Sequence, residues 1–323
     1  MKFLPVVCVC AAALTAVAAE MIPGGMQLSP RDLVGGNPPR LYSYMCPERL
    51  TMPVARPGAG KSEVTASFRL ERAMPGPVLM NIIGLDDDKP GVSTFSLDVN
   101  GKRLFSGANT FSDNYWRAMA FMLPQGLPAG ENTIKLINTS PAREGFPDYD
   151  ASWGWVCFSE TTFFDFTGDF RRFAAGEAGG AWQPIAPGAA TAAKGVVVLR
   201  SKGEGACGIV FDPGAGKMRP GVVPGMKLRV AVKMTGSGEL ALGMRCFSSR
   251  GKPLAENPEP AVFLPVADAA VPETFCAEMP MPSRGRFFAP VLTAAGECDL
   301  ALRDVAVEVL LPADGGSAVA GVR

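Results

Sequence analysis

The sequence predicts an all-β protein built from two consecutive antiparallel β-sandwich (jelly-roll) domains. Three observations point to this fold class. Apolar and polar residues alternate with a period of two in several short runs, as half-buried strands require. The 37 glycines and 29 prolines supply many turns. After the first 19 residues, no run shows the 3.6-residue period of an amphipathic helix.

A strand followed by a tight turn marks the first sandwich. Phe95, Leu97 and Val99 share one face of a two-residue alternation. Asn100-Gly101 follows at once, and this dipeptide tolerates the positive φ angles of a two-residue hairpin turn. The sequence therefore predicts a β-hairpin whose second strand covers residues 102–105. Further strands of this sandwich are expected at residues 41–45, 63–70, 77–85, 116–123, 133–138, 153–158 and 162–166.

The second half shows its clearest alternation around a glycine-rich segment. Residues 226–234 and 240–246 each place apolar side chains on one face, and Gly236-Ser237-Gly238 separates them. We expect a hairpin with an apolar core face and a basic outer face. The basic face consists of Lys227, Arg229 and Lys233. Further strands are expected at residues 196–199, 208–211, 274–279, 286–292 and 300–310.

Composition divides the chain into successive segments. The N-terminus has one lysine, then an apolar run that closes on the small residues Val17-Ala18-Ala19, which is typical of a secretory signal peptide. We therefore expect a bacterial protein that is secreted, periplasmic or on the cell surface. The expected segments are a signal peptide (1–19), a loose lead-in (20–39), the first sandwich (40–167), a Gly- and Ala-rich linker (168–180), the second sandwich (181–312) and a flexible tail (313–323).

Charge and residue usage exclude several classes of function. Lysine plus arginine and aspartate plus glutamate both total 31, so no global field favours nucleic acid, or a membrane beyond the export signal. The chain has no histidine, which rules out Ser-His-Asp, Cys-His and His-metal sites. Any catalysis would therefore rest on carboxylates, Lys, Tyr, Ser or Cys.

Six cysteines follow the signal segment. An even number in an exported protein permits disulfides, with two cysteines in the first half and four in the second. Small buried thiols within strands explain them equally well. The pairing stays open. The six are Cys46, Cys157, Cys207, Cys246, Cys276 and Cys298.

Two segments of the first half resemble a known family. Leu97-Asp98-Val99-Asn100-Gly101 and Leu127-Pro128-Ala129-Gly130-Glu131-Asn132-Thr133-Ile134 resemble the galactose-binding-like jelly roll found at the start of family 2 glycoside hydrolases. The resemblance covers about residues 60 to 166. It implies a sugar-binding domain, although such folds also serve as plain structural modules.

The second half is similar to carbohydrate-binding modules that accompany xylanases and glucanases. The residues that carry this similarity are Pro224 to Arg229 and Leu302-Arg303-Asp304-Val305. Such modules hold a structural calcium ion near their termini, and the resemblance implies Asp304 as a ligand. No other cofactor is expected. The half departs from these modules because its single tryptophan is Trp182.

Two loops of the first half carry the mixture that binds sugars, which is aromatic rings beside carboxylates and amides. They cover residues 109–116 and 140–155, and in a jelly roll they would converge at one end or line one face. A weaker candidate in the second half combines Trp182 with Arg245 and Phe247, and the basic face there would favour acidic glycans. The predicted ligand-binding residues are Asn114, Tyr115, Trp116, Asp148, Tyr149 and Trp153.

Three functions compete at this level. The leading one is a non-catalytic exported protein that binds an oligo- or polysaccharide by aromatic stacking. The second is a glycosidase or lyase, which needs two carboxylates about 5 Å apart or somewhat more. The third is a structural or adhesive scaffold, which full burial of Trp116, Tyr149 and Trp153 would favour. Carboxylates available for the second function are Asp113, Glu144, Asp148 and Asp150.

Overall fold

The computed structural model confirms the all-β class. Strands account for nearly all of the regular structure, and the described residues contain one helical turn, the 3-10 helix η1 (Pro30–Asp32). None of the described helices is long and apolar enough to span a membrane. The structure describes residues 20–42, 48–57, 61–86, 92–113, 115–141, 156–166, 181–186, 189–193, 195–203, 207–214, 219–222, 225–248, 252–254, 259–281 and 287–310.

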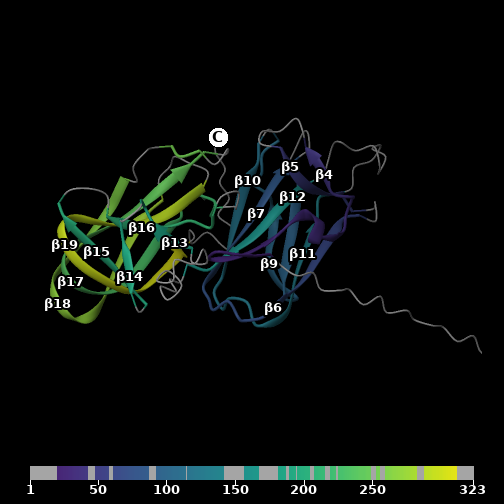
Figure 1. Cartoon of the computed structure of the whole chain (residues 1–323). Coiled ribbons are helices and arrows are strands. Elements are labelled where there is room, and N and C mark those ends of the chain that lie inside the picture. Colours follow the sequence, from purple (N-terminus) through teal and green to yellow (C-terminus); the bar gives the residue numbers. More distant parts are fainter. Residues whose placement is uncertain are drawn as a thin grey trace, which may run out of the picture.

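The first unit contains two antiparallel sheets that face each other (Figure 1). The seven-stranded sheet has β12 at its centre, with β7 and β10 on one side and β2 and β5 end to end on the other. The five-stranded sheet has the order β3-β6-β11-β8-β9. The strands are β1 (Glu20–Ile22), β2 (Gly25–Leu28), β3 (Val34–Gly35), β4 (Arg40–Tyr42), β5 (Arg49–Val54), β6 (Glu63–Leu70), β7 (Val78–Asp86), β8 (Thr94–Val99), β9 (Lys102–Ala108), β10 (Arg117–Leu123), β11 (Gly130–Asn138) and β12 (Val156–Phe164).

The connectivity of these strands is that of a jelly roll. When β5 is taken as the first of eight strands, the seven-stranded sheet contains the order β5-β12-β7-β10. The other sheet contains β6-β11-β8-β9. Apart from the β8–β9 hairpin, successive strands of these eight thus cross from one sheet to the other, as the two Greek keys of a jelly roll require. The predicted jelly-roll class is therefore confirmed for this unit by its strand pairing.

The predicted hairpin after Val99 is present. Asn100 and Gly101 have φ angles of 49° and 74°, and β8 pairs antiparallel with β9 across them. Asn100 also holds β11, because its Oδ1 accepts a hydrogen bond of 2.8 Å from the Thr133 backbone N–H. The turn therefore reverses the chain and fastens it to the neighbouring strand.

Burial differs between the two sheets of the first unit. Strand β6 alternates between buried and partly exposed residues, so only one of its faces meets the core. All nine residues of β7 are buried. Met80 and Ile82 lie in the core between the sheets, whereas Leu79 and Ile83 belong to a second cluster on the outer face. Something therefore covers the outer face of the seven-stranded sheet.

The second unit is the covering layer. It is one antiparallel sheet of seven strands with the order β13-β16-β19-β15-β14, in which β17 pairs with both β18 and β19. Figure 1 shows it beside the first unit, in green to yellow. The strands are β13 (Trp182–Pro184), β14 (Thr191–Ala193), β15 (Val196–Lys202), β16 (Gly208–Phe211), β17 (Lys227–Phe247), β18 (Glu259–Pro280) and β19 (Phe287–Leu310).

One predicted hairpin of the second unit is wrong. Residues 227–247 form the single strand β17, and Gly236-Ser237-Gly238 is a bulge where the register against β18 and β19 shifts. Gly236 has a φ of 111°, and a Cβ on it would lie 1.9 Å from the Asp299 carbonyl oxygen. The glycines let two backbones approach closely and bend the strand, and they do not reverse it.

The two units share one hydrophobic cluster. It contains Phe164 and Phe166 of the first unit together with Trp182, Phe211 and Phe288 of the second. The ring centroids of Phe166 and Phe211 are 4.8 Å apart. A hydrogen bond of 2.8 Å, donated by the Gly221 N–H to Asn81 Oδ1, also crosses the boundary. The two units are packed against each other, and we keep the name second sandwich for the second unit.

Other expectations also need correction. The lead-in is not loose, because β1 and β2 pair with each other and β2 pairs with β12. The two strands expected at residues 153–166 are the one strand β12, with a register shift between Phe158 and Thr161.

The expected signal peptide, linker and tail lie outside the described residues, so the domain boundaries stay predictions. No disulfide joins the five described cysteines to one another, and Cys46 lies outside the described residues.

Candidate functional site

The two loops expected to bind sugar begin and end at one end of the first sandwich. Strand β7 ends there at Asp86. Gly84 of β7 pairs with Arg117, the first residue of β10, and Asp86 pairs with Val156, the first residue of β12. Strands β10 and β12 therefore begin at the same end of the sheet, one on each side of β7. We call this region the loop end.

A buried carboxylate organises the loop end. Asp86 is 1% exposed and accepts hydrogen bonds from the Ser93 N–H, the Ser93 hydroxyl and Asn109 Nδ2, each at 2.9 Å. Asn109 Oδ1 in turn accepts a bond of 2.8 Å from the Phe111 N–H. These charge-assisted bonds compensate the desolvation of the carboxylate and fix the first residues of the loop before β10.

Tyr115 and Arg117 form the described polar and aromatic part of the loop end. Both side chains are partly exposed. The Arg117 guanidinium carbon lies 4.8 Å from the centre of the Tyr115 ring, and Nη2 donates a hydrogen bond to the tyrosine hydroxyl. A cation–π contact of this kind holds the ring in one orientation. The pair presents an aromatic ring, a hydroxyl and a guanidinium together at the loop end.

Trp116 is a correction to the predicted site. Its side chain is 2% exposed, so its ring faces are not available for stacking on a sugar. It packs edge-on against Tyr42, with ring centroids 6.3 Å apart. Tyr42 receives a hydrogen bond of 2.9 Å from Arg40. Trp116 therefore anchors the segment that carries Tyr115, as a buried tryptophan commonly does.

The remaining predicted residues stay predictions. Asn114 lies outside the described residues, and so do Asp148, Tyr149 and Trp153. The structure shows where the loop that carries the last three leaves and rejoins the sandwich, at Pro141 and Val156. The carboxylate pair of the enzyme hypothesis is not tested either, because of its four members only Asp113 is described.

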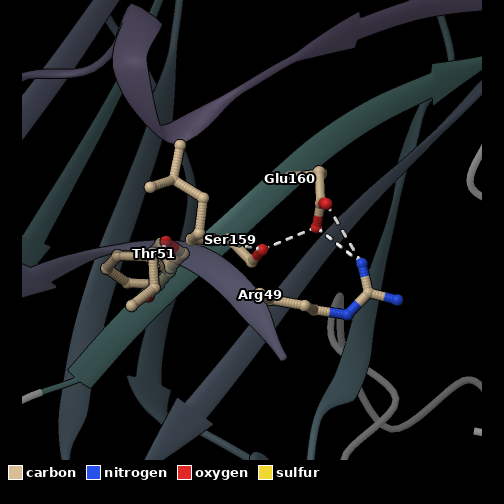
Figure 2. A network of polar contacts seen from close by, with 6 residues as sticks. Arg49, Thr51, Ser159 and Glu160 are labelled. Carbon is tan, nitrogen blue, oxygen red and sulfur yellow. Dashed lines mark hydrogen bonds and ion pairs between the residues drawn. The ribbon is translucent and has the colours of Figure 1, made fainter. Parts of the chain in front are cut away.

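Sequence reasoning missed a polar network on the outer part of β5 and β12 (Figure 2). Arg49 Nη1 lies 3.0 Å and 2.9 Å from the two carboxylate oxygens of Glu160. The Ser159 hydroxyl lies 2.6 Å from Glu160 Oε2 and 2.8 Å from the Leu50 carbonyl oxygen, so its single proton serves both. Thr51 donates to the Phe158 carbonyl oxygen at 3.1 Å.

This network has a structural role. Ser159 and Glu160 occupy the register shift of β12, at the junction between β5 and β2. The bulge releases backbone groups from the ladder, and the hydroxyls of Thr51 and Ser159 bond to carbonyl oxygens at this point. Because Arg49 and Glu160 are 111 residues apart in the sequence, no local sequence pattern predicts their contact.

The candidate site of the second sandwich is also corrected. Trp182 is 3% exposed and Phe247 is 5% exposed, so neither offers a platform to solvent. Trp182 packs on Phe211 at 5.8 Å between ring centroids, inside the shared core. Phe247 lies under the Arg219 guanidinium at 4.2 Å. Arg245, the third residue of this candidate, therefore has no exposed ring of Trp182 or Phe247 beside it.

The basic outer face of β17 is largely neutralised. Lys227, Arg229 and Lys233 are exposed, as predicted. Arg229, however, forms ion pairs of 2.7 Å with Glu278 and 3.1 Å with Glu308. Lys233 pairs in register with Asp304 on β19. Of the three cations of this face, Arg229 is thus neutralised by two carboxylates, and Lys233 has a carboxylate opposite it in the ladder.

The predicted calcium ligand stays a prediction. Asp304 is exposed on β19. Within the part of the chain that the structure describes, no group of three or more His, Cys, Asp or Glu side chains is arranged to hold a metal ion.

Comparisons with known proteins add a distant fold likeness. No protein-family profile matches the chain, and no curated protein matches it. The CBM22-1–CBM22-2 tandem domain of Xyn10C from Paenibacillus barcinonensis is 11% identical, with a TM-score of 0.32 over 92% of this chain and 100% of that one. A family 35 carbohydrate-binding module from Clostridium thermocellum is 15% identical, with a TM-score of 0.30 over 43% of this chain and 97% of that one.

A plant protein shows a similar degree of likeness. The extracellular domain of ANXUR1 from Arabidopsis thaliana is 8% identical, with a TM-score of 0.33 over 86% of this chain and 89% of that one. Likenesses this distant carry no argument about function. The fold rests on the strand pairing described above, and the function rests on the site.

Proposed function

We propose that this protein is a non-catalytic, exported sugar-binding protein whose site is the loop end of the first sandwich. The observation that carries the proposal is that β10 and β12 begin on either side of the end of β7, beside Asp86. Tyr115 and Arg117 supply a ring and polar groups there. Asn114, Asp148, Tyr149 and Trp153 are the further ligand-binding residues of this proposal, and the ligand is an oligo- or polysaccharide.

The proposed role is binding without catalysis. Asp86, the buried carboxylate of the loop end, accepts three hydrogen bonds and has a structural role there. The chain also lacks histidine, the side chain that most often transfers protons in active sites.

A glycan array with the mature chain, residues 20–323, tests the proposal. The variants are Tyr115→Ala and Tyr149→Ala, and the matched control is Phe263→Ala, an aromatic residue on β18 that is 48% exposed. We expect saturable binding to at least one glycan, a loss of about tenfold or more in either tyrosine variant, and no loss in the control. A folded protein that binds no glycan would overturn the proposal.

A scaffold role is the second candidate, and the burial of aromatic side chains favours it. Trp116 and Trp182 both lie in the cluster that joins the two sandwiches. Large aromatic side chains in a shared core stabilise a rigid two-domain body, which suits a structural or adhesive surface protein. A failed glycan array with an intact fold would make this the leading role and direct the search to protein partners.

A further inference from the structure

A pocket of about 260 Å³ lies between the two sandwiches, far from the loop end. On the first sandwich it is lined by Pro75 and Pro77, which precede β7, and by Asp165 and Phe166, which follow β12. The loop end is at the opposite ends of these two strands. Nine residues of β7 separate the two places by about 25 Å, at the usual rise of a strand.

The opposite wall comes from the outer face of the second sandwich. Arg229 and Ala231 of β17 and Ala306 and Glu308 of β19 line it. The two alanines are small, and the space they leave lies between the charged pair and the first sandwich. Pockets that bind small molecules occur preferentially at such junctions between domains.

Two of the charged groups that line the pocket, Arg229 and Glu308, are oriented before any ligand arrives. Arg229 Nε and Nη2 donate to Glu278 Oε1, at 3.1 Å and 2.7 Å, and Nη1 donates to Glu308 Oε2 at 3.1 Å. These bonds raise the pKa of Arg229 and keep it charged. They use three of the five guanidinium N–H groups and one Glu308 oxygen.

The unused donors and acceptors have a pattern that suits neighbouring hydroxyls. One hydroxyl accepts a hydrogen bond from Arg229 while the next donates to Glu308, a pairing that sugars satisfy and simple anions or cations do not. The Arg229 side chain is 48% exposed and that of Glu308 is 41% exposed, so a ligand reaches both from solvent. Pro75 and Pro77 supply apolar surface for the C–H face of a sugar ring.

We propose that this interdomain pocket is a second sugar-binding site, which holds one monosaccharide unit through Arg229 and Glu308. Its volume lies just below the roughly 300–1,000 Å³ of pockets for drug-sized ligands, which suits a single sugar ring. A ligand with about twelve heavy atoms binds with a Kd on the order of 1 mM. The site is separate from the loop end and does not depend on it.

The test is an NMR titration of the mature chain, residues 20–323, with free glucose, galactose, mannose, xylose and arabinose. Ala306→Leu fills the pocket from an exposed position on β19, and Glu308→Gln removes one acceptor charge at constant size. Ala270→Leu on β18 is the matched control, since it is also exposed but does not line the pocket. Thermal unfolding of each variant checks the fold.

We expect saturable binding of at least one of these sugars by the wild-type chain. Ala306→Leu should weaken it about tenfold or more, Glu308→Gln several-fold, and Ala270→Leu not at all. Equal affinity in wild type and Ala306→Leu, or no saturation of the wild type by any of the sugars up to about 50 mM, overturns the proposal.

A loop-end variant separates this proposal from the proposed function. Tyr115→Ala should lose binding on the glycan array and keep monosaccharide binding in the pocket. Loss of both in Tyr115→Ala would show that the loop end holds the monosaccharide too, and would overturn the second site. Array binding by the wild type without any pocket binding would leave the proposed function standing alone.

Discussion

The two sandwiches use glycine in opposite ways. The first is made of strands of at most nine residues, and Asn100-Gly101 reverses the chain between two of them. The second is organised around strands of 21, 22 and 24 residues, and Gly236 and Gly238 bend one of these without ending it. Positive φ angles occur at both places, so backbone conformation alone does not decide between a turn and a bend.

The atoms that lie opposite the glycine decide whether the chain reverses or only bends. A Cβ on Gly101 would meet nothing within 4 Å, so this turn projects from the sheet edge. Gly236 lies against the Asp299 carbonyl oxygen, and Cys298 lies against Gly238. Strand β19 continues past both positions and keeps β17 paired on either side of the bulge. A glycine-rich segment that would favour a chain reversal thus produces only a bend here, because the long neighbouring strand stays paired on both sides of it.

The largest expected effect comes from the core that joins the sandwiches. Phe211 is fully buried, and Phe211→Ala removes its contacts with Phe166 and Trp182. We expect a loss of about 3–5 kcal/mol in the free energy of unfolding, measured by urea denaturation. The exposed Phe263→Ala is the control and should change this value by less than about 0.5 kcal/mol. A cost near that of the control would show that the shared core contributes little.

The next effect tests the glycine comparison directly. Gly236→Ala should cost about 1–3 kcal/mol from backbone strain, and more where β17 must move away from Asp299. Gly101→Ala meets open space and should cost about 1 kcal/mol, the usual penalty of a left-handed residue. Denaturation curves of both variants give the difference. Equal costs would contradict the distinction between the two positions.

A single hydrogen bond between the sandwiches should have a smaller effect. Asn81→Ala leaves the buried Gly221 N–H without its acceptor, at a cost of about 1–2 kcal/mol. Asn100→Ala removes bonds that lie within the first sandwich only. Hydrogen exchange should therefore accelerate at the Gly221 amide in the first variant and not in the second. Unchanged exchange at Gly221 would argue that water replaces the bond.

The smallest expected effect concerns the thiols of the second sandwich. Burial raises the pKa of Cys207 and Cys298 above the ordinary value, and the nearby Cys298 thiol raises that of Cys207 further. The exposed Cys276 should react rapidly with a thiol reagent at neutral pH, and the two buried thiols slowly. Mass spectrometry of the labelled protein locates the adducts, and equal labelling of all three would contradict the burial of Cys207 and Cys298.

The same thiols imply a pH dependence. A group whose pKa is raised on folding stabilises the protein below its unfolded pKa and loses this contribution as the pH rises through the folded value. The free energy of unfolding should therefore fall above about pH 8.5, where unfolded thiols ionise. The double variant Cys207→Ser and Cys298→Ser should show a shallower decline. An identical decline would assign the alkaline instability to other groups.

Strand prediction succeeded where one face alone is buried. Strand β6 covers the predicted residues 63–70, because its alternation reports a core on one side and solvent on the other. The apolar run at residues 77–85 predicts a strand, and β7 is that strand. Its lack of alternation also indicates that both of its faces are covered, which the strand prediction did not include. The missing alternation of β7 is the sequence feature that points to the interface between the sandwiches.

The candidate site was predictable only in part. The composition of two loops pointed to the loop end, and the register against β7 shows that β10 and β12 both begin there. Trp116 has the same residue type as an exposed platform would have, and only its packing on Tyr42 shows it to be buried. The pocket around Arg229 and Glu308 is lined by segments up to 233 residues apart in the sequence, from Pro75 to Glu308, so no sequence motif predicts it.

The sequence by itself determined the all-β class, most strand positions and the Asn100-Gly101 turn. These follow from side-chain period and backbone conformation, which act over a few neighbouring residues. The tertiary structure alone decided that Gly236 and Gly238 bend a strand, that β7 is covered on both faces, and that Trp116 and Trp182 are buried. Each of these depends on which distant segment lies opposite, and burial and register are set by that partner.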